Sequence, residues 1–259
     1  MKSIISFMIL LLIISSSCDS QKQRQDTASA SAGLSTSMIS QKDLIGAWEA
    51  QETTDSGTVV SHIITFTDKY FSEAIYLTDP PTFMWTLGGS WKLDNGIVNR
   101  AFEYYSNDST KVGTEDAIEI QQQGSKMLFS GLSWTKLDGG IPGELQGAWL
   151  ITGRKREGKL NRRTPGERKT MKILSGTRFQ WIAYHTGTGK FSGTGGGTYT
   201  TVDGKYTEQI QFFSRDNTRV GASLEFDYAL DSGEWRHSGL SSKGTPIYEV
   251  WTPRSLLEN

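Results

Sequence analysis

An internal repeat constrains this chain more than any other feature of its sequence. Gly46-Ala47-Trp48 recurs as Gly147-Ala148-Trp149, 101 positions later, and from Phe71 onward the landmarks recur 108 positions later. The further matched segments are Gly89-Ser90-Trp91 with Gly197-Thr198-Tyr199, Tyr104–Gly113 with Phe212–Gly221, and Ser130–Ser133 with Ser238–Ser241. A period of about 100 residues is too long for a solenoid unit and has the size of a small domain. The sequence therefore predicts one fold written twice, with a seven-residue insertion in the second copy.

Each copy is patterned as a series of short antiparallel strands. Asn95-Gly96 and Asp203-Gly204 are typical of two-residue hairpin turns, because both turn positions need a positive φ. The strands after these turns alternate apolar and polar residues, as half-buried antiparallel strands do. The residues predicted to share a face are Val98, Phe102 and Tyr104 in the first copy, and Tyr206, Ile210 and Phe212 in the second. No amphipathic helix longer than two turns is found, so we predict an all-β protein of two tandem antiparallel up-and-down β-barrels.

The first 41 residues are predicted to export and tether the protein. An apolar run, Ile4–Ile14, follows Met1-Lys2 and leads through three serines to Cys18, the single cysteine. The run is too short to span a bilayer, and its order matches a secretory signal. Small residues directly before a cysteine resemble a lipobox. We therefore expect a signal peptide at 1–17, a lipid on Cys18 and a flexible polar tether at 18–41, in the cell envelope and facing either the periplasm or the surface. A signal peptide cut near Ser17 without lipidation is the alternative.

The repeated pattern resembles that of lipocalins. Both copies have Gly-x-Trp near the start, a meander of hairpins and a basic residue near the end, which is most similar to lipocalin-like lipoproteins of unknown function in Gram-negative bacteria. The resemblance covers about 44–254 and implies barrels at 42–138 and 144–256. It also implies cation–π contacts that close the barrel floors, Trp48 with Lys136 and Trp149 with Arg254. Neither copy has room for the long helix of lipocalins, so a fatty-acid-binding-protein-like or other short barrel is the alternative.

Two differences between the copies draw attention to the second barrel. Trp85 and Leu87 are replaced by Gly193 and Gly195, which would either open a cavity or permit close approach of another backbone. The insertion gives the segment from Arg154 to Lys169 eight basic and two acidic residues, in a chain with 27 basic and 28 acidic residues. As a lid it would attract an anionic ligand such as a uronic acid, a sulfated sugar or a lipid phosphate. A solvated hairpin without such a role is the alternative.

The predicted lining of the second cavity combines aromatic and charged side chains. These residues are Arg178, Phe179, Trp181, His185, Tyr199, Glu208 and Phe212. Arg100 and Glu208 occupy matching positions among apolar residues, so we expect them to point inward as salt bridges or ligand contacts. The three histidines are too scattered for a metal site, although His185 or His237 could ligate haem in a hollow barrel. No nucleophile elbow, P-loop or HExxH motif is present.

These observations favour a non-catalytic extracytoplasmic lipoprotein that binds a small amphipathic or anionic ligand in its second barrel. One alternative is a structural lipoprotein whose solid barrels contact an envelope protein or a surface glycan. A second is an enzyme on a barrel scaffold, which would need a converging carboxylate or histidine pair. We expect no cofactor and no metal, and the balanced charge gives no reason to expect nucleic acid as a partner.

Overall fold

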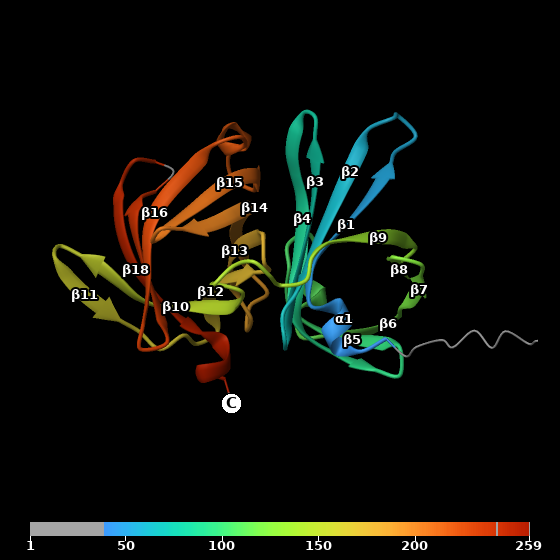
Figure 1. Cartoon of the computed structure of the whole chain (residues 1–259), viewed down its shortest axis with the longest axis horizontal. Helices are drawn as coiled ribbons and strands as arrows, with labels where there is room; N and C mark the ends of the chain where they lie inside the picture. Colours follow the sequence, from blue (N-terminus) through green and yellow to red (C-terminus); the bar gives the residue numbers. More distant parts are fainter. Residues whose placement is uncertain (1–38, 242, 259) are drawn as a thin grey trace, which may run out of the picture. The chain divides into compact units, whose positions relative to one another are not determined.

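The computed structural model describes residues 39–241 and 243–258, and these residues form two antiparallel β-sheets, each rolled into a barrel (Figure 1). This confirms the predicted all-β fold of two tandem barrels. The predicted signal peptide, Cys18 and nearly all of the tether lie outside the described residues. Within the described ranges, no helix is long and apolar enough to cross a membrane.

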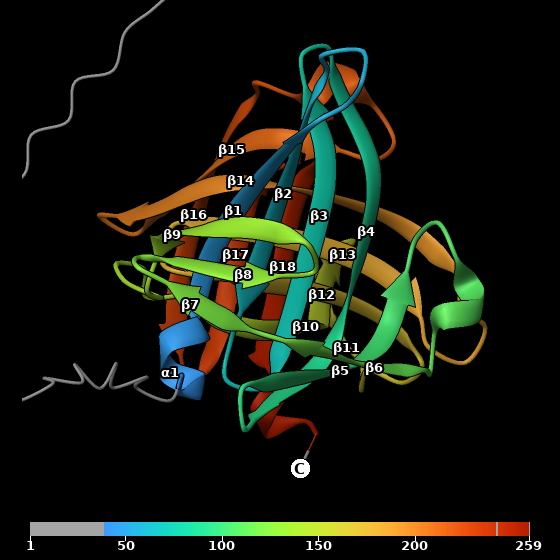
Figure 2. The same cartoon turned by 90° about the vertical axis from the view of Figure 1, so that its right-hand side faces the viewer.

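Barrel 1 follows the short helix α1 (Gln41–Leu44). Its strands are β1 (Gly46–Thr53), β2 (Val59–Phe66), β3 (Tyr70–Thr78), β4 (Pro81–Asp94), β5 (Ile97–Tyr105), β6 (Glu115–Glu119), β7 (Gln121–Gln123), β8 (Lys126–Phe129) and β9 (Leu132–Asp138). They pair in the order β6-β5-β4-β3-β2-β1-β9-β8-β7, a meander that faces the viewer in Figure 2. The two edge strands are separated in the chain only by Ile120, whose N–H donates to the carbonyl of Gly96 at 2.9 Å. They are therefore two halves of one bent strand, and the barrel is nearly closed.

Barrel 2 has the same meander with two differences. Its strands are β10 (Gly147–Arg156), β11 (Lys159–Arg162), β12 (Arg168–Leu174), β13 (Arg178–His185), β14 (Phe191–Val202), β15 (Lys205–Phe213), β16 (Ser223–Asp231), β17 (Glu234–Leu240) and β18 (Pro246–Pro253). β16 is continuous where barrel 1 has β6 and β7, and β11 is an additional strand. β10 pairs with both β12 and β18, which closes the barrel. β11 pairs with β10 alone and lies in the inserted segment. Short 3₁₀ helices complete the chain: η1 (Ser109–Lys111), η2 (Asn217–Arg219) and η3 (Arg254–Leu256).

The predicted hairpin turns are confirmed. Asn95 and Gly96 have φ values of 49° and 79°, and Asp203 and Gly204 have φ values of 49° and 74°. Both central positions of each turn are thus left-handed, as a two-residue turn between twisted strands requires. The two turns lie at equivalent positions of the barrels, between β4 and β5 and between β14 and β15.

The predicted faces of Tyr104 and Phe212 are wrong, because each copy contains a β-bulge at the same place. Gly88 lies opposite Tyr104 while Gly89 lies opposite Phe102, so the residue between Phe102 and Tyr104 has no partner on β4. The same skip occurs in barrel 2, where Phe212 and Ile210 lie opposite consecutive glycines. Residues before the bulge stay in the barrel cores, whereas Tyr104 and Phe212 turn to the outer faces. A strict period of two cannot reveal one extra residue.

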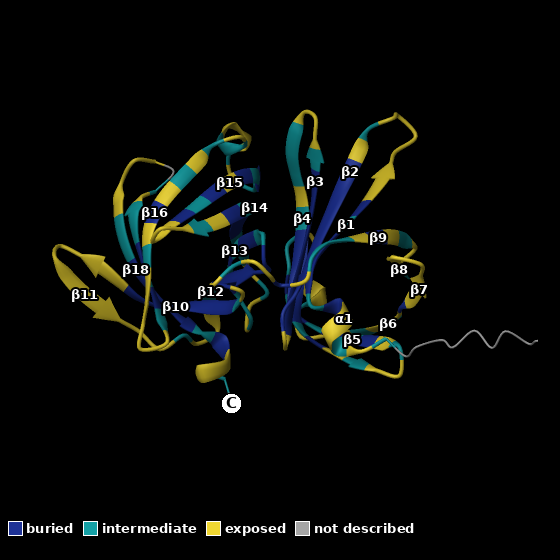
Figure 3. Ribbon diagram, in the orientation of Figure 1, coloured by how far each residue is buried: buried dark blue, intermediate teal, exposed yellow. Residues whose placement is uncertain are grey.

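The outer faces of the two barrels pack against each other through equivalent residues. Ser72 and Gln180 are 108 positions apart in the chain, and the Ser72 hydroxyl donates to Gln180 Oε1 at 2.5 Å. Phe83 stacks on its equivalent Phe191, with ring centres 6.2 Å apart. Figure 3 shows buried stretches along β3, β4 and β13, which lie at this contact.

The same contact surface contains two further ring pairs, which are equivalent to each other in the repeat. Tyr76 stacks on Phe212 with ring centres 5.0 Å apart. Its equivalent Tyr184 packs on Tyr104, the equivalent of Phe212, at 4.8 Å. Such reciprocity characterises a two-fold isologous interface. The two copies in this one chain thus pack against each other in the way that two subunits of a homodimer do.

Candidate functional site

Four of the seven predicted lining residues lie in the interior of barrel 2. Phe179 and Tyr199 are buried in its apolar core, and Trp181 packs against that core. The fourth, Glu208, accepts a hydrogen bond of 2.8 Å from Lys172 Nζ, and both side chains are only 6% exposed. The ammonium lies within 4.7–5.9 Å of four aromatic ring centres, those of Tyr206, Phe226, Trp235 and Trp251. An ion pair enclosed by aromatic rings thus fills the middle of this barrel.

The other three predicted lining residues lie elsewhere. Arg178 donates to Gln211 on the outer face, because successive strand residues point to opposite faces and Phe179 points inward. His185 is half-buried at the end of β13, with Nε2 3.9 Å from Glu167 Oε2. Phe212 faces barrel 1 because of the bulge. None of the three lines the core of barrel 2.

The glycines of β14 allow close approach rather than opening a cavity. A Cβ at Gly195 would lie 2.8 Å from both Trp181 Nε1 and Phe213 Cδ2, and a Cβ at Gly193 would lie 2.7 Å from Arg215 Nε. The space that Leu87 fills in barrel 1 is therefore taken by an indole from the neighbouring strand. In barrel 1 the large side chain at this position is Leu87 of β4, whereas in barrel 2 it is Trp181 of β13.

The interior of barrel 1 contains an alternating chain of charges. His62 bridges two carboxylates, with Nδ1 3.1 Å from Glu73 Oε1 and Nε2 3.2 Å from Glu52 Oε1. Arg100 lies 3.8 Å from Glu73 Oε2 and donates to both oxygens of Asp116 at 2.9 and 2.6 Å. Each buried charge therefore has an opposite charge beside it. Arg100 points inward as predicted, and Asp116 is the carboxylate that pairs with it.

The His62 bridge predicts a pH-dependent stability. Burial lowers the pKa of His62, but the hydrogen bonds and charges of Glu73 and Glu52 outweigh it and raise the pKa above the ordinary value. A group with a raised folded pKa stabilises the fold fully at pH below the unfolded value, about 6.5, and loses this contribution as the pH rises through the folded value. We expect the difference in unfolding free energy between wild type and His62→Gln to shrink as the pH rises, measured by urea unfolding from pH 5 to 9. A pH-independent difference would contradict this.

A basic cleft lies between the β10–β11 hairpin and β12 of barrel 2. Its volume is about 430 Å³. It is lined by Ile151, Gly153, Arg154, Arg156, Asn161, Arg162, Arg163, Arg168 and Thr170. Beyond Leu150, β10 leaves β12 and pairs with β11 instead, so the barrel wall is open here. The inserted segment thus forms a hairpin that borders a lateral opening.

A bulge in β10 places Arg154 beside a buried carboxylate of barrel 2. The pairing of β10 with β18 shifts between Ile151 and Gly153, after which Arg154 lies opposite Glu249. Arg154 Nη2 donates to Glu249 Oε1 at 2.5 Å, and Glu249 Oε2 accepts from Trp251 Nε1 at 3.2 Å. Burial alone would raise the pKa of Glu249, but His237, Arg154 and Lys172 together lower it to about 2. Glu249 is therefore an ionised link between the cleft and the core.

The remaining arginines of the cleft differ in how they are held. Arg162 donates to both carboxylate oxygens of Glu234, at 2.6 and 2.8 Å. Arg163 Nε donates to the carbonyl of Ile151 at 3.3 Å. The side chains of Arg156 and Arg168 make no hydrogen bond or ion pair with any residue that the structure describes. Burial and the charges of Arg154 and Arg168 lower the pKa of Arg163, so positive charge is concentrated here.

Several buried polar atoms in the interior of barrel 2 have no hydrogen-bond partner among the described residues. They are Tyr206 Oη, Trp235 Nε1 and both ring nitrogens of His237. His237 Nδ1 lies 3.4 Å from Glu249 Oε2 but without hydrogen-bond geometry. Burial and the charge of Lys172 lower the pKa of this histidine. The interior of barrel 2 is thus less completely paired than that of barrel 1.

The two floor cations expected from the lipocalin pattern lie in different places. Lys136 Nζ lies 5.1 Å from the centre of the Trp48 ring. Arg254 does not face Trp149, because Pro253 is the residue opposite Trp149 and Arg254 begins the 3₁₀ helix after it. Its guanidinium lies instead over Tyr70 of barrel 1, 3.9 Å from the ring centre.

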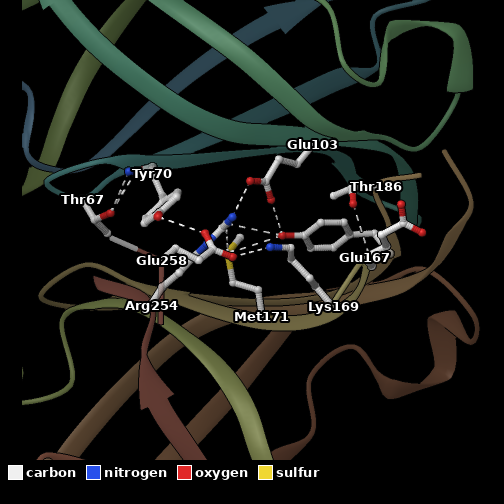
Figure 4. Close-up of polar contacts among 10 residues, drawn as sticks. Thr67, Tyr70, Glu103, Glu167, Lys169, Met171, Thr186, Arg254 and Glu258 are labelled. Atoms are coloured by element: carbon white, nitrogen blue, oxygen red, sulfur yellow. Dashed lines mark hydrogen bonds and ion pairs between the residues drawn. The ribbon is translucent and has the colours of Figure 1, made fainter. Parts of the chain in front are cut away.

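Arg254 is the centre of a polar cluster between the barrels. Figure 4 shows its guanidinium between Glu103 and Glu258, both of which accept its hydrogen bonds. Tyr70 Oη donates to Glu258 at 3.2 Å, and Lys169 donates to the same carboxylate. Arg254 is only 1% exposed, and although burial lowers its pKa, the neighbouring Tyr184 and Glu103 raise it. This arginine therefore joins the two barrels instead of closing one.

Sequence reasoning missed Lys172 and Arg254 as the buried cations of barrel 2 and of the interface. The signal for Lys172 was a single lysine in the apolar run Met171–Leu174, at a position that alternates with Met171 and Ile173. No comparable signal marked Arg254, because its partners Glu103 and Tyr70 belong to the other copy. No protein-family model matches the chain, and no curated protein matches it at a significant level.

Proposed function

We propose that this protein is a non-catalytic, lipid-anchored protein of the cell envelope that binds a small anionic ligand at the basic cleft of barrel 2. The observation that carries this proposal is the group of five arginines around one opening in the barrel wall. A concave site lined by one sign of charge concentrates ligands of the opposite sign. The membrane anchor at Cys18 is part of the proposal and follows from the sequence pattern alone.

The interiors of the barrels favour barrel 2 as the binding barrel. In barrel 1 each buried charge has an opposite partner, from Glu52 to Asp116. In barrel 2, polar atoms of Tyr206, Trp235 and His237 are buried without partners. Buried polar groups in folded proteins are normally hydrogen-bonded, so such atoms are suited to a polar guest. Apolar neighbours of the cleft such as Ile151 would accept the uncharged part of an amphipathic ligand.

Calorimetric titration of the purified protein with glucuronate, glucose 6-sulfate and glucose 6-phosphate tests the proposal. We expect at least one of these anions to bind at physiological ionic strength, and neutral glucose not to bind. Arg156→Ala/Arg168→Ala should weaken binding at least tenfold, because a charge-assisted hydrogen bond contributes about 1.5–3 kcal/mol.

Lys155→Ala/Lys159→Ala is the matched control, since it removes the same amount of charge from the same basic segment. Neither lysine lines the cleft, and Lys155 lies over Tyr248 instead. Equal losses in both double variants would mean that net charge attracts the anion without a specific site. Failure of every anion to bind the wild type would contradict the proposed function.

A further inference from the structure

Arginine and lysine residues of the inserted segment lie in different places. All five that line the cleft are arginines, although the same segment contains three lysines, Lys155, Lys159 and Lys169. Lys169 is held by Glu258 at the barrel interface, away from the cleft. Arginine presents a planar fork of donors that matches two oxygens of one oxyanion, whereas lysine is a single point charge. The cleft is therefore built for oxyanion geometry as well as for charge.

Two of the five arginines are already paired with carboxylates. Glu249 binds Arg154, and Glu234 binds Arg162 through both oxygens. Within the described residues, Arg156 and Arg168 have no such partner, and Arg163 uses only its Nε, toward a backbone carbonyl. Glu249 and Glu234 thus each pair with one arginine of the cleft, and Glu234 is shared with Arg236 outside it. Three cleft arginines have no carboxylate partner among the described residues and are left to share a ligand.

A group with more than one charge and more than two oxygens fits three guanidiniums best. A carboxylate has one charge and two oxygens, and a sulfate monoester has one charge and three free oxygens. A phosphate monoester carries a charge of about −1.5 to −2 near neutral pH and offers three strong acceptor oxygens. Asn161 and Thr170 line the same cleft and supply neutral hydrogen-bond donors beside the arginines.

We propose that the head group recognised at this site is a phosphate monoester in its dianionic form, held by Arg156, Arg163 and Arg168. This inference rests on the proposed function and specifies its ligand. The phosphate would come either from a membrane lipid with a terminal phosphate or from a soluble phosphorylated sugar, and both present the same group to the cleft.

The test compares three ligands of one scaffold at constant ionic strength. Glucose 6-phosphate should bind at least tenfold more tightly than glucose 6-sulfate or glucuronate at pH 7.5, since it alone brings a second charge. Its affinity should fall as the pH drops below about 6, where the second proton binds to the phosphate, while the affinity for the sulfate stays constant. Equal affinities for the three anions, or a flat pH profile, would overturn the phosphate assignment and leave anion binding intact. Absence of any binding would overturn the proposed function itself.

Substitutions test whether the three arginines hold the phosphate. Arg163→Ala and Arg168→Ala should each weaken glucose 6-phosphate binding about 10- to 100-fold, as loss of a charge-assisted hydrogen bond does. Lys155→Ala removes the same charge outside the cleft and should change affinity less than about threefold. Thermal unfolding checks that each variant is folded, and Arg168 is exposed, so its replacement tests the site even if Arg163→Ala is unstable. Equal effects of Arg168→Ala and Lys155→Ala would contradict the assignment.

Vesicle sedimentation separates the two sources of phosphate. Binding to phosphatidylcholine vesicles that contain phosphatidic acid, but not to those that contain phosphatidylglycerol, would assign the site to a terminal lipid phosphate. Binding of glucose 6-phosphate without vesicle binding would assign it to a soluble ligand. Equal binding to both anionic vesicles, unaffected by Arg168→Ala, would show surface attraction only and would contradict the proposal.

Discussion

Replacement of Glu208 by leucine is expected to destabilise the protein by about 3–5 kcal/mol, because it leaves the Lys172 ammonium buried without a counter-ion. Both side chains of this pair are 6% exposed, so water cannot replace the lost carboxylate. Four aromatic rings surround the ammonium, and their attraction is too weak to offset the desolvation of a full charge. The measurement is the free energy of unfolding in urea, followed by tryptophan fluorescence.

The double variant Lys172→Met/Glu208→Leu is the control for this prediction. Replacing a buried ion pair by apolar residues of similar volume is often neutral or stabilising. We therefore expect the double variant to be more stable than Glu208→Leu and close to wild type. If the double variant were as unstable as the single one, packing around Glu208 rather than the unpaired charge would be the cause.

Replacement of Arg254 by methionine is expected to cost about 3–5 kcal/mol of unfolding free energy, since it removes a buried charge that two carboxylates share. Glu103 belongs to barrel 1, so its lost contact is one that joins the barrels, whereas Glu258 lies in the same C-terminal segment as Arg254. The stacking on Tyr70 is lost as well. Urea unfolding measures the loss, and protection of β3 and β13 amides against hydrogen exchange should fall most.

Lys136→Met provides the comparison for Arg254→Met. Lys136 is the other expected floor cation, and it is partly exposed, with contacts to Trp48 and to the carbonyl of Asp43. Its replacement should cost only about 1 kcal/mol. Equal costs for the two variants would show that Arg254 does not join the barrels in the way that its contacts indicate.

The repeat and the turn residues allowed much of the fold to be predicted. The constant offset of 108 positions and the Asn95-Gly96 and Asp203-Gly204 turns led to two equivalent β-barrels. These signals lie in the repeat itself or within a few neighbouring residues, so they can be recognised without the structure. The inward direction of Arg100 and Glu208 followed from alternation along one strand before any bulge, and so it also could be predicted.

The errors arose where one residue's surroundings depend on a distant segment. The bulges at Glu103 and Gln211 reversed the faces of Tyr104 and Phe212, and a sequence read with period two does not show an inserted position. The glycines of β14 left a cavity and close approach both open, and only the folded barrel shows that Trp181 of the neighbouring strand β13 fills that space. The basic segment was recognised, but not which of its arginines are neutralised, since Glu234 and Glu249 are contributed by β17 and β18.

The sequence by itself thus determined that a β-barrel domain occurs twice and that the second copy carries a concentrated positive charge. Periodicity, turn chemistry and composition decide these properties, and each is encoded within a few neighbouring residues. Only the tertiary structure decided that the copies pack as a two-fold pair, that Arg254 joins them, and that the arginines of the insertion border an opening in the barrel wall. These properties depend on which residues contact each other across strands and across the two copies. Strand register, bulges and packing determine those contacts, and the order of residues along the chain does not show them.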